Sequence, residues 1–445
     1  MSDHDDLARL AADAYVYGYP LVFDVSMVQR CLRTGFGSLP ATQANRFAHA
    51  RKLAGPQDDF VSVNNDTIYS LAQLDLSGGP LLLRVPDTAD SYYVLQFVDT
   101  WTNNFAYVGR RATGTDAAVF VVAPPGWIGA VPEGTRVITA PTTVASIVGR
   151  FACAGPDDLD RVAKLQEQLT LEPLGDPGPT AGLPVPDDTV PEDLRFWEQL
   201  RVLLAAFPPD TEDAEYQRRY AALGLLHEGG SPYHDAPGDL VTALRNGYAA
   251  GRQRVEEASR TGLDDRSSTW HMALHLFDYN VDRLGLGTVD SPDWRIGDRR
   301  ASYLVRAVAA RVGLWGNHAY EAVYATTYTD AEGRQLNGSR NYTLTFPSPP
   351  PVDAFWSVTM YDMPDYFLID NAANRYSIGD RTPGLVHGPD GSLTLYLMHA
   401  KPVEGEAANW LPTPAGDFRP MLRMYQPGKA VLDGSYQLPD IQPLD

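Results

Sequence analysis

The run Trp270-His271-Met272-Ala273-Leu274-His275 places two histidines four positions apart. On a helix this spacing puts both imidazoles on one face, one turn apart, as in many metal sites. A carboxylate such as Asp278 or Asp282 would complete a ligand set for ferrous iron or zinc. The run lacks the glutamate of the zinc-protease motif H-E-x-x-H. We therefore take His271 and His275 as candidate ligands of a divalent transition metal, and the alternative is two hydrogen-bonded histidines that pack a helix.

A second candidate is the polar run Asn64-Asn65-Asp66-Thr67. A carboxylate and amides at the mouth of a pocket bind hydroxyl groups or orient a water molecule. Asp66 is a candidate general acid or base, and Asn65 a candidate substrate-binding residue. Because Asn and Asp also cap the element that follows a turn, an ordinary strand-entry turn is the alternative.

The third candidate is Asp99-Thr100-Trp101-Thr102-Asn103-Asn104. In a strand, Asp99, Trp101 and Asn103 share one face. These residues would suit a ligand cleft in which Asp99 is catalytic, the Trp101 indole stacks on the substrate and Asn103 binds it. The alternative is a core in which the polar groups pair with one another, because unpaired buried polar groups are costly.

The fourth candidate is Arg375-Tyr376-Ser377-Ile378-Gly379-Asp380-Arg381. A guanidinium binds carboxylates through two parallel hydrogen bonds, so Arg375 and Tyr376 are candidate substrate-binding residues and Asp380 a candidate catalytic acid. An internal ion pair that joins two loops, Arg375 with Asp380 or Asp362 with Arg381, is the alternative.

The elements that must position these residues occur in blocks. Residues 5–33 predict two helices with a break or a kink at Gly18-Tyr19-Pro20, because proline removes an amide donor and disfavours a helical residue before it. Alternation with a period of two predicts strands over about 60–150. Helices are expected at 156–172, 192–207, 238–260 and 300–312, and short strands from there to 436. Blocks of this kind indicate an α+β fold with antiparallel sheets. We detect no internal repeat and no phosphate-binding or G-x-S-x-G motif.

Composition limits the partners. The 56 acidic and 36 basic residues give a net charge of −20, which opposes binding to nucleic acid or to an anionic membrane. Cys31 and Cys153 are the only cysteines, and they form neither a disulfide framework nor a zinc site. The first residues lack the apolar stretch of a signal peptide, and no run of apolar residues is long enough to span a bilayer. We expect a cytoplasmic protein.

Several motifs, in this order along the chain, resemble bacterial proteins that pair domain of unknown function 1254 with domain of unknown function 1214. The N-terminal motifs are Gly18-Tyr19-Pro20-Leu21-Val22, Asn64 to Ser70, Tyr92-Tyr93 and Asp99 to Asn104; the C-terminal motifs are Phe355 to Asp362, Asn374 to Arg381, Asp390 to Tyr396, Asn409 to Pro412 and Leu422 to Tyr425. The resemblance implies two antiparallel, partly jelly-roll-like β-sandwich modules, a helical middle segment and homo-oligomers. It divides the chain into residues 1–155, 156–298 and 299–445, but it implies no reaction.

These observations favour an enzyme that acts on a small molecule in a cleft between the two β modules. The reaction would be hydrolytic, lyase-type or metal-assisted oxidative. One alternative is a non-catalytic β-sandwich that binds a carbohydrate or another small ligand, since aromatic and amide side chains serve that purpose equally well. The other is a structural homo-oligomer. A β-sandwich hosts all three classes of function, so the fold does not decide among them.

Overall fold

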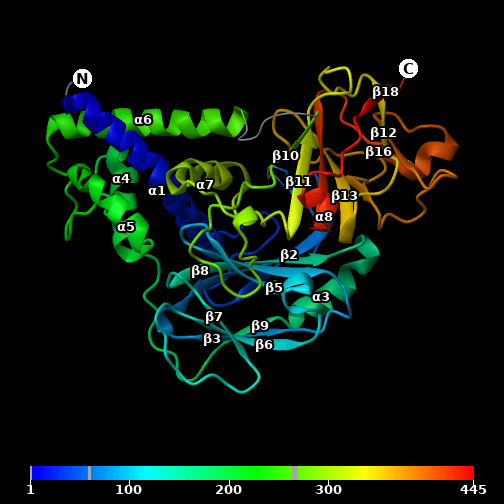
Figure 1. Ribbon diagram of the computed structural model, residues 1–445. Coiled ribbons are helices and arrows are strands. Elements are labelled where there is room, and N and C mark those ends of the chain that lie inside the picture. The colour runs from blue at the N-terminus through cyan, green and yellow to red at the C-terminus, as the bar shows by residue number, and fades with distance from the viewer. Residues whose placement is uncertain (1–2, 59–61, 262–268, 445) are drawn as a thin grey trace.

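The computed structural model describes residues 3–58, 62–261 and 269–444, which form two β modules and a group of helices (Figure 1). The first module lies at the bottom of this view, the second at the upper right and the long helices at the upper left. The prediction of an α+β fold with antiparallel sheets in separate modules is confirmed.

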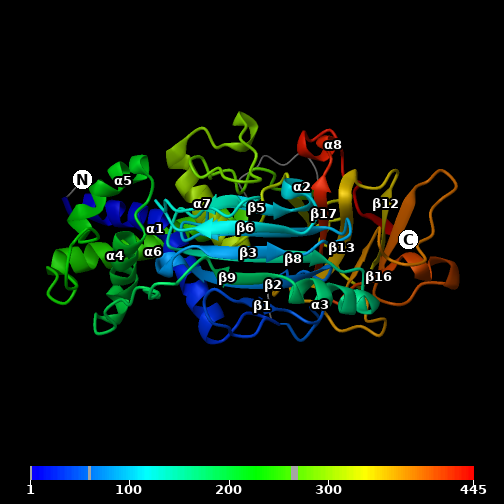
Figure 2. The same ribbon diagram turned by 90° about the horizontal axis from the view of Figure 1, so that it is seen from below.

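The first module contains a five-stranded and a four-stranded sheet. The five-stranded sheet has the order β1-β2-β8-β4-β5, with β1 Phe47–His49, β2 Thr67–Asp75, β8 Val144–Ala152, β4 Tyr93–Asp99 and β5 Asn104–Gly109. The four-stranded sheet has the order β7-β6-β3-β9, with β7 Arg136–Thr139, β6 Ala118–Ala123, β3 Leu81–Val85 and β9 Thr170–Pro173. Strand β3 alternates buried and more exposed residues, whereas β4 and β8 are buried throughout. One face of β3 is therefore solvated, whereas the middle strands of the five-stranded sheet have no solvated face. Figure 2 shows the four-stranded sheet from its outer side.

The second module is built in the same way. Its five-stranded sheet has the order β10-β11-β17-β13-β14, with β10 Trp270–Met272, β11 Ala322–Thr327, β17 Phe418–Pro427, β13 Val352–Asp362 and β14 Ser377–Gly379. Its four-stranded sheet has the order β16-β15-β12-β18, with β16 Trp410–Pro412, β15 Leu393–Met398, β12 Asn341–Phe346 and β18 Gln442–Leu444. The two sheets enclose a core of their own that includes Trp356, Leu395 and Leu422.

The two modules share one topology. If the nine strands of each module are numbered from one in chain order, the five-stranded sheet is 1-2-8-4-5 and the four-stranded sheet is 7-6-3-9 in both. In both modules strands 6 and 7 form a parallel pair, whereas the other paired strands are antiparallel. The structure thus contains an internal repeat that we do not detect in the sequence.

The helices cover the first module and join it to the second. The longer ones are α1 Asp3–Arg33, α4 Arg195–Ala206, α6 Gly238–Thr261 and α7 Arg299–Gly313, and the shorter ones are α2 Arg110–Thr113, α3 Leu159–Glu167, α5 Thr211–Gln217 and α8 Lys429–Leu432. Short 3₁₀ segments lie at Leu76–Gly78, Pro156–Asp158, Glu192–Leu194, Arg218–Leu223, Pro292–Trp294 and Glu404–Asn409. Helices α6 and α7 match the predicted ranges, whereas the helix predicted at 156–172 ends at Glu167 and is followed by β9. No helix within the described ranges combines the length and apolarity needed to cross a membrane.

The predicted break at Gly18-Tyr19-Pro20 is wrong, because α1 runs through Pro20 without interruption. Gly18 lies so close to α4 that a Cβ atom there would come within 2.4 Å of Leu200. Tyr15 stacks on Tyr19 at 5.7 Å between ring centroids, and both belong to or pack on the main core. Packing against α4 and α6 outweighs the hydrogen bond that proline removes from the helix.

Candidate functional site

The two modules meet through their five-stranded sheets, where a small cluster of buried side chains comes from both. At this interface the strand registers define corresponding residues. Arg150 of β8 lies opposite Tyr69 of β2, and Arg423 of β17 lies opposite Tyr324 of β11. Both arginines are buried at the interface, with exposed fractions of 5% and 3%. The repeat therefore places an arginine beside a tyrosine twice, once in each module.

On the other side of each arginine the correspondence continues. Arg150 lies opposite Val94 of β4, which in turn lies opposite Gly109 of β5. In the second module Arg423 lies opposite Ser357 of β13, which lies opposite Gly379 of β14. Each glycine approaches the backbone of its neighbour so closely that a Cβ atom would overlap a carbonyl oxygen. The registers of the two sheets can thus be superimposed residue by residue across three strands.

Each module contributes one buried carboxylate to the interface, three residues before its tyrosine. Glu321 accepts hydrogen bonds from the Tyr92 hydroxyl at 3.2 Å and from Arg111 Nε at 2.5 Å. Its counterpart, Asp66, accepts a hydrogen bond from the Tyr425 hydroxyl at 2.8 Å and another from the Ser357 hydroxyl. Both acids are therefore held by donors of the other module, but only Glu321 is held by a cation.

Arg111 and Arg381 also correspond, because each lies two residues after the glycine of its module. Arg111 forms an ion pair with Glu321 across the interface. Arg381 also crosses the interface, but it donates to the backbone carbonyl of Asp66 at 3.0 Å. Its guanidinium lies over the Phe355 ring, 3.5 Å from the centroid. Among the described residues, no carboxylate forms an ion pair with Arg381.

A cleft of about 430 Å³ opens at this end of the interface and reaches Arg381. Its volume is within the range of small-molecule sites. Corresponding residues of both modules line it, among them Tyr92 with Phe355 and Asp90 with Asp353. The lining also includes four alanines, which leave room in the cleft: Ala89, Ala152, Ala154 and Ala354.

Two further arginines line the cleft, and both are engaged by the protein. Arg161 binds Asp158 through two hydrogen bonds of 2.6 and 2.8 Å. Burial alone would raise the pKa of Asp158, but the hydrogen bonds from Arg161 and the Ala154 amide bring it below its usual value. Arg110 donates to the Gln426 side chain at 2.6 Å and forms an ion pair with Asp90 at 3.4 Å. Arg381 is therefore the cleft arginine whose charge the described carboxylates leave without a direct partner.

Burial and a neighbouring cation set the electrostatics at Glu321. Burial raises the pKa of Glu321, and the neighbouring Arg111 partly opposes that shift. Burial and the adjacent Glu321 carboxylate raise the pKa of Tyr92 well above its usual value, so this phenol remains a donor. The Arg111 end of the interface is thus a closed ion pair, whereas the Arg381 end is not.

Of the predicted site residues, Asp66 and Asn65 lie nearest this region. The Asp66 carboxylate faces the second module and is 4% exposed. Asn65 donates to the carbonyl of Ala54 at 2.5 Å and accepts from the Ser377 hydroxyl at 3.0 Å, so its amide joins the modules. Asn64 accepts from the amides of Asp66 and Thr67, as in the turn proposed as the alternative. Both candidates thus hold the interface together and do not line the cleft.

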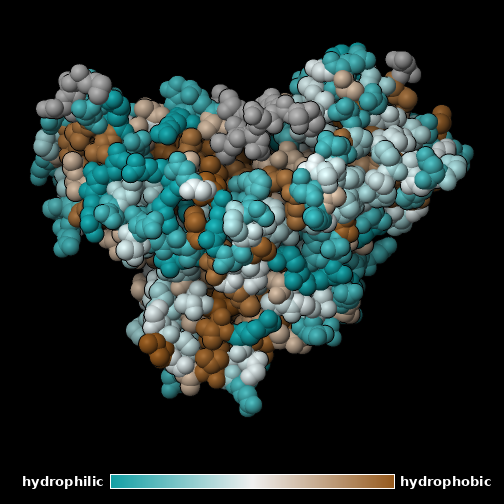
Figure 3. Space-filling model, viewed as in Figure 1, coloured by the Kyte–Doolittle hydropathy of each residue, from teal (hydrophilic) through white to brown (hydrophobic). Residues whose placement is uncertain are grey.

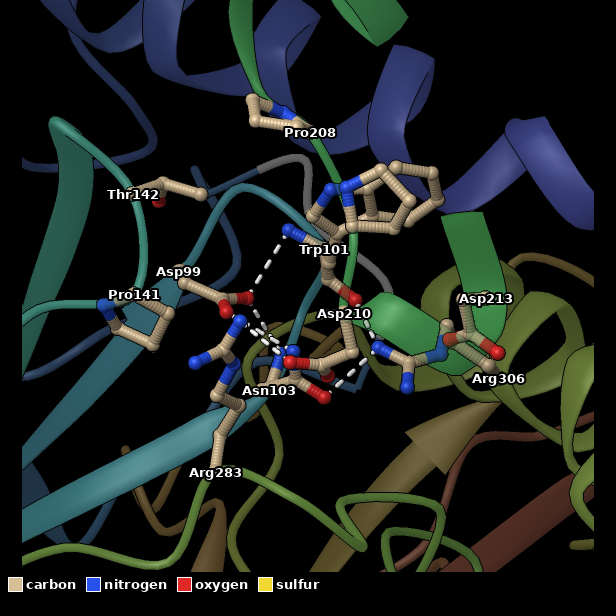
Figure 4. Close-up of a pocket in the computed structure, with 11 residues that line it drawn as sticks. Asp99, Trp101, Asn103, Pro141, Thr142, Pro208, Asp210, Asp213, Arg283 and Arg306 are labelled. Atoms are coloured by element: carbon tan, nitrogen blue, oxygen red, sulfur yellow. Dashed lines mark hydrogen bonds and ion pairs between the residues drawn. The ribbon is translucent and has the colours of Figure 1, made fainter. Parts of the chain in front are cut away.

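Asp99, Trp101 and Asn103 lie together in a second place, at the turn between β4 and β5 (Figure 4). Asp99 accepts hydrogen bonds from both backbone amides of Trp101 and Asn103 at 2.9 Å, and from the Asn103 side chain at 2.8 Å. Burial raises the pKa of Asp99 to about 6, although these hydrogen bonds oppose the shift. The cavity beside them measures about 10 Å³, which is room for about one water molecule.

The indole of Trp101 is not open to a ligand. It is 6% exposed, donates to the carbonyl of Phe207 at 2.9 Å and lies 5.3 Å from the ring of Tyr17. Arg306 donates to Asn103 at 2.9 Å and fills the remaining side of the turn. The polar groups of this turn therefore pair with one another, which is the alternative that the sequence left open.

Arg375, Tyr376 and Asp380 do not converge. Arg375 Nη1 donates to three backbone carbonyls, those of Ala407, Ala408 and Trp410, at 3.3, 3.1 and 2.8 Å. Tyr376 contacts Asn374, and the exposed Asp380 accepts from the Trp356 amide at 3.2 Å. Within the described part of the chain, neither Arg375 with Asp380 nor Asp362 with Arg381 forms an ion pair.

His271 and His275 do not share a helix, which was the condition for metal-ligand spacing. His271 lies in β10 opposite Thr326, and His275 lies in the turn that follows. His275 Nδ1 is 2.7 Å from Asp278, whose pKa burial raises to about 6 against the effect of this hydrogen bond. The described residues contain no group of three His, Cys, Asp or Glu side chains that could hold a metal ion.

Several residues of the cleft escaped the sequence reasoning. Arg381 belongs to a motif that we singled out, but only as an ion-pair partner of Asp362. Tyr92 and Phe355 stand in two other motifs without an assigned role. Arg161 of the cleft and Glu321 of the interface carry no local signal, since a single charged residue between ordinary neighbours has no distinctive spacing.

Comparison with known protein families agrees with the presence of two β modules. Residues 44–173 match the family "Protein of unknown function (DUF1254)", and residues 321–429 match "Protein of unknown function (DUF1214)". The chain therefore carries a match to the first family in its N-terminal part and to the second in its C-terminal part, as the sequence motifs predict. No curated protein matches the chain.

Two solved structures resemble it. The VPA0106 protein from Vibrio parahaemolyticus is 23% identical, with a TM-score of 0.75, over 99% of this chain and 100% of that chain. A putative uncharacterized protein from Burkholderia cenocepacia is 10% identical, with a TM-score of 0.46, over 100% of this chain and 96% of that chain. The first likeness shows that the fold recurs, and it carries no activity.

Proposed function

We propose that this protein, which pairs two regions of unknown function, binds a small organic anion in the cleft between its β modules. The observation that carries the proposal is Arg381. Its guanidinium lines a cleft of about 430 Å³, and no described carboxylate forms an ion pair with it. Burying part of a cation without a carboxylate in direct contact is costly, and an anionic ligand would supply that contact.

The surroundings of Arg381 favour a ligand that also has an apolar part. Tyr92 and Phe355 line the cleft, although both rings are almost fully buried, and the four alanines add small apolar contacts. On the face shown in Figure 3 hydrophilic residues predominate, and hydrophobic residues show in smaller areas between them. A cleft that combines apolar surface with a few polar and charged groups is the usual form of a small-molecule site.

The enzyme expected from the sequence is compatible with this proposal, because an enzyme would bind its substrate in the same cleft before turnover. Among the described residues that line the cleft, none is a histidine, lysine or cysteine. The Ser91 hydroxyl accepts from Arg161 at 3.2 Å and has no base beside it within the lining. These side chains favour binding over nucleophilic catalysis. The expected homo-oligomer and the cytoplasmic location remain predictions.

The test is a thermal-shift screen of the full chain, followed by calorimetry of the compounds that stabilise it. The screen contains aryl carboxylates, phosphates and sulfonates, their neutral analogues, and mono- and oligosaccharides. A ligand at one hundred times its dissociation constant should stabilise the folded state by about 2.7 kcal/mol. We expect stabilisation by an anion and not by its neutral analogue, and we expect Arg381→Gln to abolish it.

Arg136→Gln is the matched control, because Arg136 also lies over an aromatic ring, at 4.9 Å from the Phe120 centroid, but in the four-stranded sheet. If no anion stabilises the protein, or if both variants lose binding equally, the proposal is wrong. Binding of a sugar that Arg381→Gln leaves unchanged would favour the carbohydrate-binding alternative instead. Incubation of the bound compound with the protein, followed by NMR, then tests for turnover.

A further inference from the structure

The internal repeat indicates which anionic group belongs at Arg381, and this inference rests on the proposed function. We infer that the ligand is a carboxylate, and that its carboxylate occupies at Arg381 the place that the Glu321 carboxylate occupies at Arg111. Arg111 and Arg381 occupy corresponding positions in the two modules. At Arg111 the carboxylate is a side chain of the protein, and at Arg381 the described residues supply no carboxylate.

Arg111 shows how this scaffold binds a carboxylate. Its Nε donates to Glu321 Oε2 at 2.5 Å, and its guanidinium lies over the rings of Tyr107 and Tyr320 at 5.6 and 4.8 Å. Tyr92 donates to the second oxygen of the same carboxylate at 3.2 Å. A planar guanidinium that lies on aromatic rings and binds a carboxylate at its edge is an arrangement that suits arginine better than lysine.

Asp66 does not supply the same group at Arg381. Its side chain is one methylene shorter than that of Glu321, and its two carboxylate oxygens accept hydrogen bonds from Tyr425 and Ser357. Arg381 reaches only the backbone carbonyl of Asp66, through Nη2. Its Nε and Nη1 donors have no hydrogen-bond partner within the described ranges.

The position of Arg381 is nevertheless fixed. The guanidinium lies 3.5 Å from the centroid of the Phe355 ring, closer than Arg111 lies to either of its aromatic neighbours. Phe355 corresponds to Tyr92, and both line the cleft. A fixed guanidinium loses little side-chain entropy on binding, so a planar carboxylate can accept two parallel hydrogen bonds from it. The alanines beside it accommodate the apolar part of the ligand.

The experiment compares three probes by calorimetry on the full chain: phenylacetate, its neutral analogue phenylacetamide, and phenylphosphonate, an anion with a tetrahedral head group. We expect one site per chain for phenylacetate. Phenylacetamide should bind at least about tenfold more weakly, since a hydrogen-bonded charge pair contributes tenfold to hundredfold. Phenylphosphonate should bind more weakly than phenylacetate, because its head group is not planar like the Glu321 carboxylate. Arg381→Gln should weaken the binding of phenylacetate by about tenfold or more. Arg381→Lys should recover only part of it, because an ammonium group lacks the planar fork. Arg136→Gln should bind like the natural protein.

A second variant, Asp66→Glu, tests the correspondence itself. The added methylene gives Asp66 the length of Glu321, so the new carboxylate should reach Arg381 and compete with the ligand. We expect phenylacetate to bind at least about tenfold more weakly to this variant. If the longer side chain prevents folding, the comparison of probes and of the two Arg381 variants still decides the matter.

The possible outcomes separate the inference from the proposed function. Tighter binding of phenylphosphonate, lost in Arg381→Gln, would overturn the carboxylate and leave an anion-binding cleft. If phenylacetamide bound as tightly as phenylacetate, the inferred role of charge would be wrong. A folded Asp66→Glu protein that binds phenylacetate unchanged would overturn the correspondence with Glu321. If no organic anion of the wider screen binds, the proposed function itself fails.

Discussion

The two ends of the interface between the modules are built from corresponding residues but have different chemistry. At one end Arg111 of the first module meets the Glu321 carboxylate of the second. At the other end Arg381 of the second module meets only the backbone of Asp66 in the first. The two ends differ at several corresponding positions. Glu321 corresponds to Asp66 and Tyr92 to Phe355, and the Asp66 donors Tyr425 and Ser357 correspond to Ala152 and Val94. The comparison teaches that one scaffold can provide both an ion pair that joins the modules and an arginine that remains available to a ligand.

The largest expected difference concerns stability. Replacing Arg111 by Met leaves the Glu321 carboxylate buried without its cation, and breaking such a pair costs about 3–5 kcal/mol. Replacing Arg381 by Met removes one hydrogen bond to a carbonyl, which costs about 1 kcal/mol. Urea unfolding followed by tryptophan fluorescence measures both. Equal losses would mean that the two ends do not differ as their geometry indicates.

The next effect concerns the two corresponding glycines. A Cβ atom at Gly109 would lie 2.3 Å from the carbonyl oxygen of Tyr93, and one at Gly379 would lie 2.1 Å from that of Trp356. Alanine at either position should therefore destabilise the protein by about 1–3 kcal/mol. The φ angle of Gly109 is +150°, which adds strain for alanine there, so Gly109→Ala should be the more severe. A tolerated substitution at one position alone would show that the registers correspond less closely than their pairing indicates.

A third difference depends on pH and is confined to the second module's side of the interface. His318, three residues before Glu321, corresponds to Val63, which does not titrate. Burial, followed by the charge of Arg111, lowers the pKa of His318 to about 3. Because the folded state holds this ring neutral, its contribution to stability is complete above about pH 6.5 and is lost as the pH falls toward 3.

Histidine NMR resonances of the natural protein and of His318→Phe would identify this ring. We expect the His318 resonance to stay constant from pH 8 to pH 5, and the stability of the variant to depend less on pH in the acid range. A His318 resonance that moves with a midpoint near pH 6.5 would contradict the burial of this ring at the interface.

Much of the fold follows from local patterns in the sequence. Alternation predicted the inner strands of both modules but not β1, β9, β10 and β18, and the period of 3.6 predicted α6 and α7 within a residue or two. The same rules failed at Pro20, because packing against α4 and α6 stabilises a helix that local propensity would end. They also failed for His271, which pairs with β11 although the spacing of its run suits a helix.

The sequence by itself therefore determined the two blocks of strands, the helical middle and several of the motifs that line the interface. Only the tertiary structure decided that the two blocks share one strand order, that Asp66 corresponds to Glu321, and that Arg381 faces a cleft. The physical reason is that strand order rests on backbone hydrogen bonds, which any side chain that suits the burial pattern allows. Corresponding positions can thus differ in side chain while the sheet stays the same. Whether a charged group finds a partner depends on residues that are distant in the chain, and no local spacing records that.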